Sequence, residues 1–551
     1  MSTEAESRFR DFDLQGFHQV IAISEDNINA SLNDRFDEEI QPELLSFSHE
    51  VPGFGVASAT LNPPRVSICT ETESETTMSI FYLNFKSGSY QYKTQVEGGT
   101  TETVNLDGAT VAFDVRFDEK RLQAPPPGNP ALESKWKKLE PGKYSLNQIV
   151  MFLGSAPLSS LNLKETKLPG LDPNSPRFPM KKLFFDMFIT MYLTKLQAHP
   201  DALTLGYAIK KESAEKDERN PTYPPTSVKY QNYRYQPCKD TSAIIDGKPV
   251  APGARNAFLF VEMTNNDAFP QEKLERKGNI IVGNMPGGLV LGKQLFVQKY
   301  LVGTAFKDFN TNMLDTANQL FTWIHNESGY PGAKQWWLTD GSRDEAVSKA
   351  KWSLAGDGKS ASASWEGRMH NSYRDHSPFG ETLTTNYNAG IYPKPRTNEI
   401  MVDAQLNLFY HEIIPVPSLS GQPSGVDRFV EAEVYFKLVF RLVEVHDDGL
   451  LGVEVEQTIK TCRCRAADNR NRVAWAEWVL GPSNDNLANE LTEKLRGVIT
   501  PVGDVLATYI NKQQQFVFPG SKTFFYKNPM FSDACDLLVR LEYQQKDLNK
   551  K

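Results

Sequence analysis

The sequence predicts an elongated α+β protein in which long, highly curved antiparallel β-sheets wrap around long amphipathic helices. Near the C-terminus, apolar residues recur at spacings of three and four, which places them on one face of a helix over 485–510. Most segments before it alternate apolar and polar residues, as half-buried antiparallel strands do. A helix of roughly 40 Å needs an equally long apolar partner, so we expect the strands to curve along it. The apolar face comprises Leu487, Leu491, Leu495, Val498, Val502, Leu506 and Ile510.

The N-terminal region begins with a strand and a short helix. Val20 to Ile23 is a β-branched, apolar run typical of a strand. Ser24 follows as a good N-cap, because its hydroxyl can accept a bond from a free backbone N–H of the first helical turn. Ile28, Leu32 and Phe36 then recur every four residues, which predicts a helix with one apolar face.

Period-two patterns come next and predict antiparallel strands. Phe81, Leu83 and Phe85 alternate with Tyr82 and Asn84. The clearest alternation places Val111, Phe113, Val115 and Phe117 on one face. The acidic segment 70–77 is expected to be a hairpin tip, and the proline-rich segment 125–130 a surface loop.

The middle of the chain mixes strands and helices. Tyr144 to Ala156 is predicted to be a strand, and so are the segments 203–209 and 257–263. Leu183 to Leu196 is apolar nearly all round, which predicts a buried helix. Leu289 to Phe309 is predicted to be a second helix. Its apolar face comprises Leu291, Leu295, Val302, Phe306 and Phe309.

The strongest hairpin signal is Val434 to Glu456, with a turn at Asp448-Gly449. One face of its first strand comprises Val434, Phe436, Leu438, Phe440 and Leu442. Before it lies a tryptophan-rich region with two interpretations: an exposed membrane or carbohydrate surface, or ordinary strand packing, which we favour. Its members are Trp323, Trp336, Trp337, Trp352 and Trp365. We expect two halves, 1–270 and 271–551, the second containing the helices 289–309 and 485–510.

Composition excludes several functional classes. The net charge is −8 with acidic and basic residues interspersed, so no nucleic-acid partner is expected. Five scattered cysteines are too few for a disulfide framework and predict reduced, buried thiols. The N-terminus has no apolar signal core, and no run reaches the ~18 apolar residues of a membrane span. We expect a soluble protein, cytoplasmic or released without a signal peptide.

The motifs that resemble catalytic or metal sites are each incomplete. His411-Glu412 lacks a second histidine one helical turn later, where Pro415 stands, so a strand end is favoured over a zinc site. Gly358-Lys359-Ser360 lacks the upstream glycine and strand of a phosphate-binding loop. Cys462 and Cys464 supply only two ligands, fewer than a tetrahedral metal shell needs. We expect no enzyme activity, no metal and no cofactor.

Several segments together resemble the tubular lipid-binding (TULIP) superfamily, specifically the accessory proteins encoded beside clostridial neurotoxins in OrfX-type gene clusters. The collinear matches are Val20 to Ser24 with Ile28, Asn29 and Leu32, then Leu205-Gly206-Tyr207, Tyr223 to Val228, Phe258 to Thr264 and Gly287 to Phe309. Phe17-His18 departs from the aromatic-acidic pair usual in the family. The resemblance implies a curved sheet rolled around a long helix, an apolar groove or tube, and binding of lipids or interaction with a toxin or membrane partner.

The leading hypothesis is non-enzymatic binding of a lipid or other apolar ligand in a tubular groove, between the sheet and the helices 289–309 and 485–510. The partners expected are a lipid or lipid-like molecule, with a peripheral membrane contact or a protein partner. The alternative is a scaffold component, as in a toxin complex, with a filled core and no ligand. The predicted ligand-binding residues are Leu291, Leu295, Val302, Phe306, Leu487, Leu491, Leu495, Val498, Val502 and Leu506.

Overall fold

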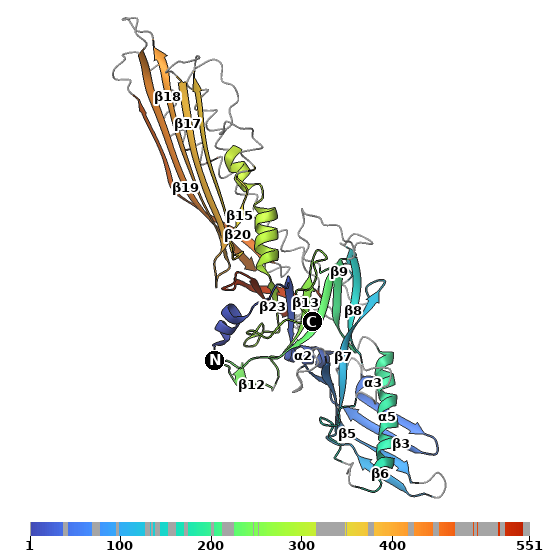
Figure 1. Cartoon of the computed structure of the whole chain (residues 1–551). Coiled ribbons are helices and arrows are strands. Elements are labelled where there is room, and N and C mark those ends of the chain that lie inside the picture. The colour runs from blue at the N-terminus through green and yellow to red at the C-terminus, as the bar shows by residue number, and fades with distance from the viewer. Residues whose placement is uncertain are drawn as a thin grey trace, which may run out of the picture.

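The computed structural model is an elongated molecule built on three main antiparallel sheets (Figure 1). A sheet of long strands stands at one end, a second sheet with the helix α5 lies at the other, and a six-stranded sheet joins them. The structure describes residues 2–36, 42–68, 78–94, 99–126, 133, 136–137, 144–152, 161–169, 175–199, 203–211, 225–245, 247–251, 253–315, 348, 350–372, 380–416, 424–444, 451–468, 489, 493, 516–517 and 524–543.

The central sheet has the strand order β10-β13-β1-β14-β23-β22. Its strands are β1 (Gln19–Ser24), β10 (Ser227–Tyr233), β13 (Ala257–Met263), β14 (Gly287–Leu291), β22 (Phe524–Phe531) and β23 (Leu537–Tyr543). Every residue of β1, β13 and β14 is buried, as in a sheet covered on both faces. Ile21 of β1 pairs with Phe260 on one side and Leu289 on the other. The strands predicted at 20–23 and 257–263 are confirmed.

The N-terminal sheet has nine strands in the order β2-β3-β5-β7-β8-β9-β21, with β4 and β6 also paired to β5. They are β2 (Ser46–Val51), β3 (Gly55–Leu61), β4 (Arg65–Ser67), β5 (Met78–Lys93), β6 (Thr101–Asn105), β7 (Thr110–Leu122), β8 (Tyr144–Phe152), β9 (Thr204–Lys211) and β21 (Phe516–Val517). The predicted alternation in β7 is confirmed, since Val111, Phe113, Val115 and Phe117 are all buried. Strands β4 and β5 pair antiparallel, and the tip predicted at 70–77 lies outside the described residues.

The C-terminal sheet is a meander whose strands are neighbours in sequence order. They are β15 (Ser353–Leu354), β16 (Ala361–Ser372), β17 (Gly380–Pro393), β18 (Glu399–Val416), β19 (Ser424–Glu444) and β20 (Leu451–Asp468). The predicted hairpin is confirmed, because β19 and β20 pair antiparallel from Glu444 opposite Leu451. On its predicted apolar face Val434, Leu438, Phe440 and Leu442 are buried. The turn at 448–449 lies outside the described residues.

The short N-terminal helices are α1 (Glu4–Glu6), the π-helical segment η1 (Ser7–Asp11), α2 (Glu25–Arg35) and α3 (Pro42–Leu45). The predicted N-cap of α2 is confirmed: the backbone N–H of Asn27 donates to Oγ of Ser24 at 3.1 Å. The apolar face is confirmed as well, since Ile28, Leu32 and Phe36 are all buried.

The helix predicted at 183–196 is confirmed as α5 (Phe178–Ala198), but its expected burial on all sides is wrong. One face packs against protein: Phe184 stacks on Tyr92 with ring centroids 5.1 Å apart, and the hydroxyl of Tyr90 donates to the carbonyl of Lys181 at 3.0 Å. The opposite face is open, with Leu183 60% exposed. Figure 1 shows why: α5 lies along the end of the N-terminal sheet with one side turned outward.

The helix predicted at 289–309 begins later than expected. Leu289 and Leu291 belong to β14, where β1 and β23 supply hydrogen-bonding partners on both edges. Gly292 ends the strand, its N–H donating to the carbonyl of His18 at 2.8 Å, and the π-helical segment η4 (Gln294–Ala305) follows. The helix predicted at 485–510 lies outside the described residues except at Asn489 and Glu493. Both are helical and exposed.

The described part of the chain is therefore an α+β protein with antiparallel sheets, as the sequence predicts. Curved sheet wrapped around long helices stays a prediction. The central sheet takes β1, β10 and β13 from residues 1–270, and β14, β22 and β23 from residues 271–551. A boundary between two halves near residue 270 stays a prediction as well.

The remaining motifs occupy structural positions. Trp365 is buried, and Trp352 packs against the core, where its indole N–H donates to the carbonyl of Phe306 at 2.9 Å. The other three tryptophans of that region, Trp323, Trp336 and Trp337, lie outside the described residues. Cys238 and Cys535 are free, buried thiols, as predicted. The incomplete zinc motif lies within strand β18, and the glycine-lysine motif lies in a turn between β15 and β16. Among the described residues no cluster of His, Cys, Asp and Glu is suited to a metal ion.

Candidate functional site

The structure brings four of the predicted ligand-binding residues into one apolar cluster. Leu291, Leu295 and Phe306 are buried and Val302 is half-buried in it. The ring of Phe306 meets the ring of Phe440 edge-on, with centroids 5.2 Å apart. Protein side chains therefore contact these positions. The other six predicted residues, Leu487, Leu491, Leu495, Val498, Val502 and Leu506, lie outside the described residues.

A second stripe of apolar side chains runs along the outer face of α5. Met180, Leu183, Met187 and Met191 follow one another at spacings of three, four and four, which places them on one side of the helix, although Met187 is half-buried against the core. Leu183 is 60% exposed, Met180 41% and Met191 37%. Methionine and leucine side chains that face solvent in a row form a surface suited to an apolar partner.

The basic residues beside this stripe outnumber the acidic ones that contact them. The helix itself carries three lysines and one aspartate. Asp186 is paired with Lys182, and Glu102 is paired with Arg177 and Lys181. Near the other end, Lys195 donates to the carbonyl of Glu43. None of the exposed side chains of α5 in the described residues is charged: its three lysines and Asp186 are partly buried, so the exposed part of this face is apolar with partly buried basic groups beside it.

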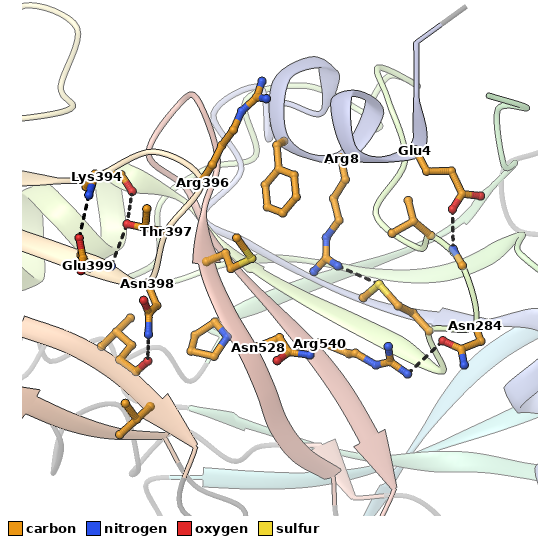
Figure 2. Close-up of a pocket in the computed structure, with 18 residues that line it drawn as sticks. Glu4, Arg8, Asn284, Lys394, Arg396, Thr397, Asn398, Glu399, Asn528 and Arg540 are labelled. Atoms are coloured by element: carbon orange, nitrogen blue, oxygen red, sulfur yellow. Dashed lines mark hydrogen bonds and ion pairs between the residues drawn. The ribbon is translucent and has the colours of Figure 1, made fainter. Parts of the chain in front are cut away.

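A pocket of about 990 Å³ lies where the N-terminal segment, the loop before β14, the loop between β17 and β18, and strands β22 and β23 come together (Figure 2). Its apolar wall includes Phe9, Val282, Met285, Leu442 and Met530. Its polar wall includes Glu4, Arg8, Lys394, Arg396, Glu399 and Arg540. The segments that form it are hundreds of residues apart in the chain, so only the folded structure assembles it.

Arg8 is the charged group least compensated in this pocket. Only 9% of its surface is exposed, and its Nη1 donates to the thioether sulfur of Met285 at 2.8 Å. Its Nε is buried without a hydrogen-bond partner, and no carboxylate among the described residues pairs with it. Burial and, to a smaller extent, the positive charge of Arg540 lower the pKa of Arg8 to about 10. At neutral pH Arg8 is therefore still a cation.

The other charged groups of the pocket already have partners. Arg396 makes a two-pronged contact to Asp533 at 2.8 and 2.7 Å. Lys394 donates to Glu399 at 3.0 Å. Arg540 pairs with Glu542 at 2.7 Å, and its Nη2 donates to Asn284 at 3.2 Å. In Figure 2, Arg8 extends from the helical N-terminal segment into the pocket, whereas Arg540 turns toward Asn284.

The acidic groups of the pocket are engaged elsewhere. Glu4 lies 3.5 Å from Arg255 and accepts a hydrogen bond from the hydroxyl of Tyr235 at 2.6 Å. Glu399 is held by Lys394 and by Arg441 at 3.1 Å, and these hydrogen bonds keep its pKa below the usual value. The positive charge of Arg8 is thus available to a ligand.

The sequence alone predicted neither the exposed apolar stripe of α5 nor the pocket around Arg8. The spacing that forms the outer stripe of α5 was visible in the sequence, but apolar residues on all sides were interpreted as complete burial. Arg8 gave no signal at all, because nothing in its local sequence shows that it becomes buried beside Met285. Neither this pocket nor a smaller one near Tyr230 and Lys229 includes the predicted residues in its wall.

Comparison with known proteins gives weak similarities. No protein-family model and no curated protein sequence matches the chain. Among solved structures, P47 of Clostridium botulinum E1 is 10% identical with a TM-score of 0.46, covering 96% of this chain and 99% of that chain. P47 from Clostridium botulinum A2 is 11% identical with a TM-score of 0.47, covering 97% and 98%. A lipopolysaccharide binding protein is 8% identical with a TM-score of 0.27, covering 96% and 99%. At these TM-scores we draw no functional inference from the similarities.

Proposed function

We propose that this protein is a non-enzymatic lipid binder that meets a lipid surface with the outer face of α5. The proposal rests on one observation: Met180, Leu183 and Met191 form an exposed apolar row flanked by basic side chains. A helix that lies in the plane of a membrane interface buries such a row in the boundary between headgroups and acyl chains. No helix in the described part of the chain is long and apolar enough to cross a membrane.

The sizes of the expected binding terms favour a reversible contact with the membrane. Each CH₂ group removed from water contributes about 0.8 kcal/mol. Each basic residue near an anionic membrane surface contributes about 1 kcal/mol, and salt screens this term. Three exposed apolar side chains therefore support a peripheral contact. Lys181 and Lys182 are already paired with Glu102 and Asp186, so the electrostatic contribution is smaller than three free lysines would give and the preference for anionic lipids is modest.

Vesicle flotation of the full chain tests this proposal. The protein is expected to float with vesicles of phosphatidylcholine and phosphatidylserine, and less with phosphatidylcholine alone. The double variant Leu183→Glu, Met191→Glu should lose flotation, because two carboxylates on the apolar row oppose insertion. Ser364→Glu, an exposed change on β16, is the matched control and should float like the wild type. Undiminished flotation of the double variant would rule out α5 as the contact.

A bound ligand in the interior is the second part of the proposal. It would lie between the sheets and the helices around Leu295, Phe306, Leu491 and Val502, where burial of acyl chains supplies the affinity. Native mass spectrometry of the purified protein, followed by solvent extraction, tests it. Adducts in the lipid mass range that disappear in the variant Leu491→Trp, Val502→Trp would support it. A clean protein mass after incubation with mixed lipids would count against it.

A scaffold with a filled core is the other candidate function. One observation favours it: Leu295 and Phe306 are buried, and the ring of Phe306 meets the ring of Phe440 edge-on. Such a protein would expose α5 to another protein instead of a lipid. It would show no adducts and no flotation, and would retain a partner whose binding the Leu183→Glu, Met191→Glu variant abolishes.

A further inference from the structure

Arg8 is a buried cation whose surroundings leave part of its hydrogen-bonding capacity unused. A guanidinium carries five N–H donors in a rigid, planar fork. The sulfur of Met285 takes one of them, and a thioether is a weak acceptor. The Nε donor has no partner. A buried donor left without an acceptor is costly, and its presence calls for an explanation such as a missing ion.

The positive charge of Arg540 acts on Arg8 across the same pocket. Arg540 is 24% exposed and already paired with Glu542, so it adds positive potential to the pocket and not a second unpaired guanidinium. An anion bound at Arg8 would offset the repulsion between the two charges. Planar guanidinium groups fit the oxygen atoms of phosphate in a two-pronged arrangement, which a single ammonium group cannot reproduce.

We propose that this pocket is a binding site for a phosphate group, held by Arg8 with help from Arg540. Its volume of about 990 Å³ exceeds what a phosphate alone would occupy. Phe9, Met285 and Met530 supply an apolar wall beside the two arginines. The pocket therefore has room for a phosphate that carries an organic part, as in a phosphomonoester or the headgroup of a phospholipid, and both share the phosphate chemistry that Arg8 recognises.

This site is separate from the lipid contact proposed for α5. The pocket is formed by η1, β22, β23 and the loop between β17 and β18, whereas α5 lies on the N-terminal sheet (Figure 1). Variants of Arg8 leave α5 unchanged, and soluble phosphates need no vesicle. Failure of one proposal is therefore distinguishable from failure of the other.

Thermal unfolding of the full chain, titrated with three compounds at constant ionic strength, tests the site. The compounds are inorganic phosphate, glycerol 3-phosphate and a short-chain phosphatidic acid, with chloride as the reference anion. A ligand that binds only the folded state stabilises it by RT ln(1 + L/Kd), where L is the ligand concentration, so the unfolding midpoint rises with the logarithm of the ligand concentration above Kd. We expect at least one of the three to raise the wild-type midpoint at concentrations where chloride does not.

The variants decide which residues are responsible. Arg8→Met should weaken the apparent affinity at least tenfold, and Arg8→Lys, which keeps the charge and loses the fork, should weaken it less. Arg234→Met removes an exposed arginine outside the pocket and should change nothing. A response to all three compounds supports recognition of the phosphate group itself, and a response to the phosphatidic acid alone supports a lipid headgroup. No response from the wild type, or a response of Arg8→Met equal to that of the wild type, would overturn the proposal.

Discussion

Arg8 Nη1 donates a hydrogen bond to the sulfur of Met285 at 2.8 Å, so that a guanidinium cation has a thioether as its hydrogen-bond partner. In folded proteins, buried arginines are ordinarily paired with carboxylates or held by several good acceptors. Here the residue is 9% exposed and, within the described part of the chain, has neither. The folded state therefore bears the free-energy cost of a buried cation that is not fully compensated.

Replacing Arg8 with methionine should stabilise the protein in the absence of ligand. Methionine keeps much of the unbranched apolar stem and removes the buried charge, so we expect the free energy of unfolding to rise by about 1–3 kcal/mol. Urea unfolding in buffer free of phosphate measures it. Arg234→Met, an exposed change, should stay within about 0.5 kcal/mol of the wild type. A loss of stability in Arg8→Met would show that the guanidinium is better compensated than its contacts indicate.

Removing the hydroxyl of Ser24 should weaken the junction between β1 and α2. Its Oγ accepts from Asn27 N at 3.1 Å and donates to the carbonyl of Pro286 at 3.0 Å. Ser24→Ala should cost about 1 kcal/mol, the usual loss for an N-cap. Ser24→Thr keeps a hydroxyl and should recover most of this stability. Equal unfolding midpoints for wild type and Ser24→Ala would contradict the assigned role.

The elements that sequence predicted well depend on local patterns. In β7, residues that alternate along the strand point to opposite faces, so Val111 and Phe113 reach the core whatever the rest of the fold does. The same reasoning holds for Leu438 and Phe440 in β19. Ser24 was identifiable because capping needs only the residues of the first helical turn.

The elements that sequence could not settle depend on distant partners. Leu289 and Leu291 suit a helical stripe as well as a strand, and pairing with β1 and β23 decides for the strand. The apolar residues of α5 cover every side, so their spacing does not tell which side meets protein. The Arg8 pocket needs segments near residues 8, 285, 396 and 540 to meet, and no local pattern encodes that.

Truncating a side chain on the inner face of α5 should destabilise the protein, whereas truncating one on the outer face should leave its stability unchanged. Phe188 on the inner face is buried against Tyr90, with ring centroids 5.8 Å apart, so Phe188→Ala should cost about 3–5 kcal/mol. Leu183 on the outer face is exposed, so Leu183→Ala should change stability by no more than about 0.5 kcal/mol. Chemical denaturation of both variants checks this. A large loss for Leu183→Ala would mean that protein covers the outer face in solution.

Stability should carry a pH dependence that comes from Asp536. This carboxyl is buried, and although Oδ1 accepts from the backbone N–H of Lys293 at 2.8 Å, burial raises its pKa to about 6. In the unfolded chain its pKa is near 3.9. At low pH Asp536 is protonated in both the folded and the unfolded state, so it does not reduce the free energy of unfolding. As pH rises through the interval from about 4 to 6 the unfolded state ionises first, so the folded state loses up to about 3 kcal/mol relative to it.

Asp536→Asn should remove this dependence, because the amide oxygen can still accept from Lys293 and carries no charge at any pH. The variant should match the wild type near pH 3.5 and exceed its stability by up to about 3 kcal/mol above pH 6. Urea unfolding of both proteins across this range measures the difference. Because all other titrating groups are shared, the difference isolates Asp536. A difference that does not change with pH would show that Asp536 titrates alike in the folded and unfolded chains.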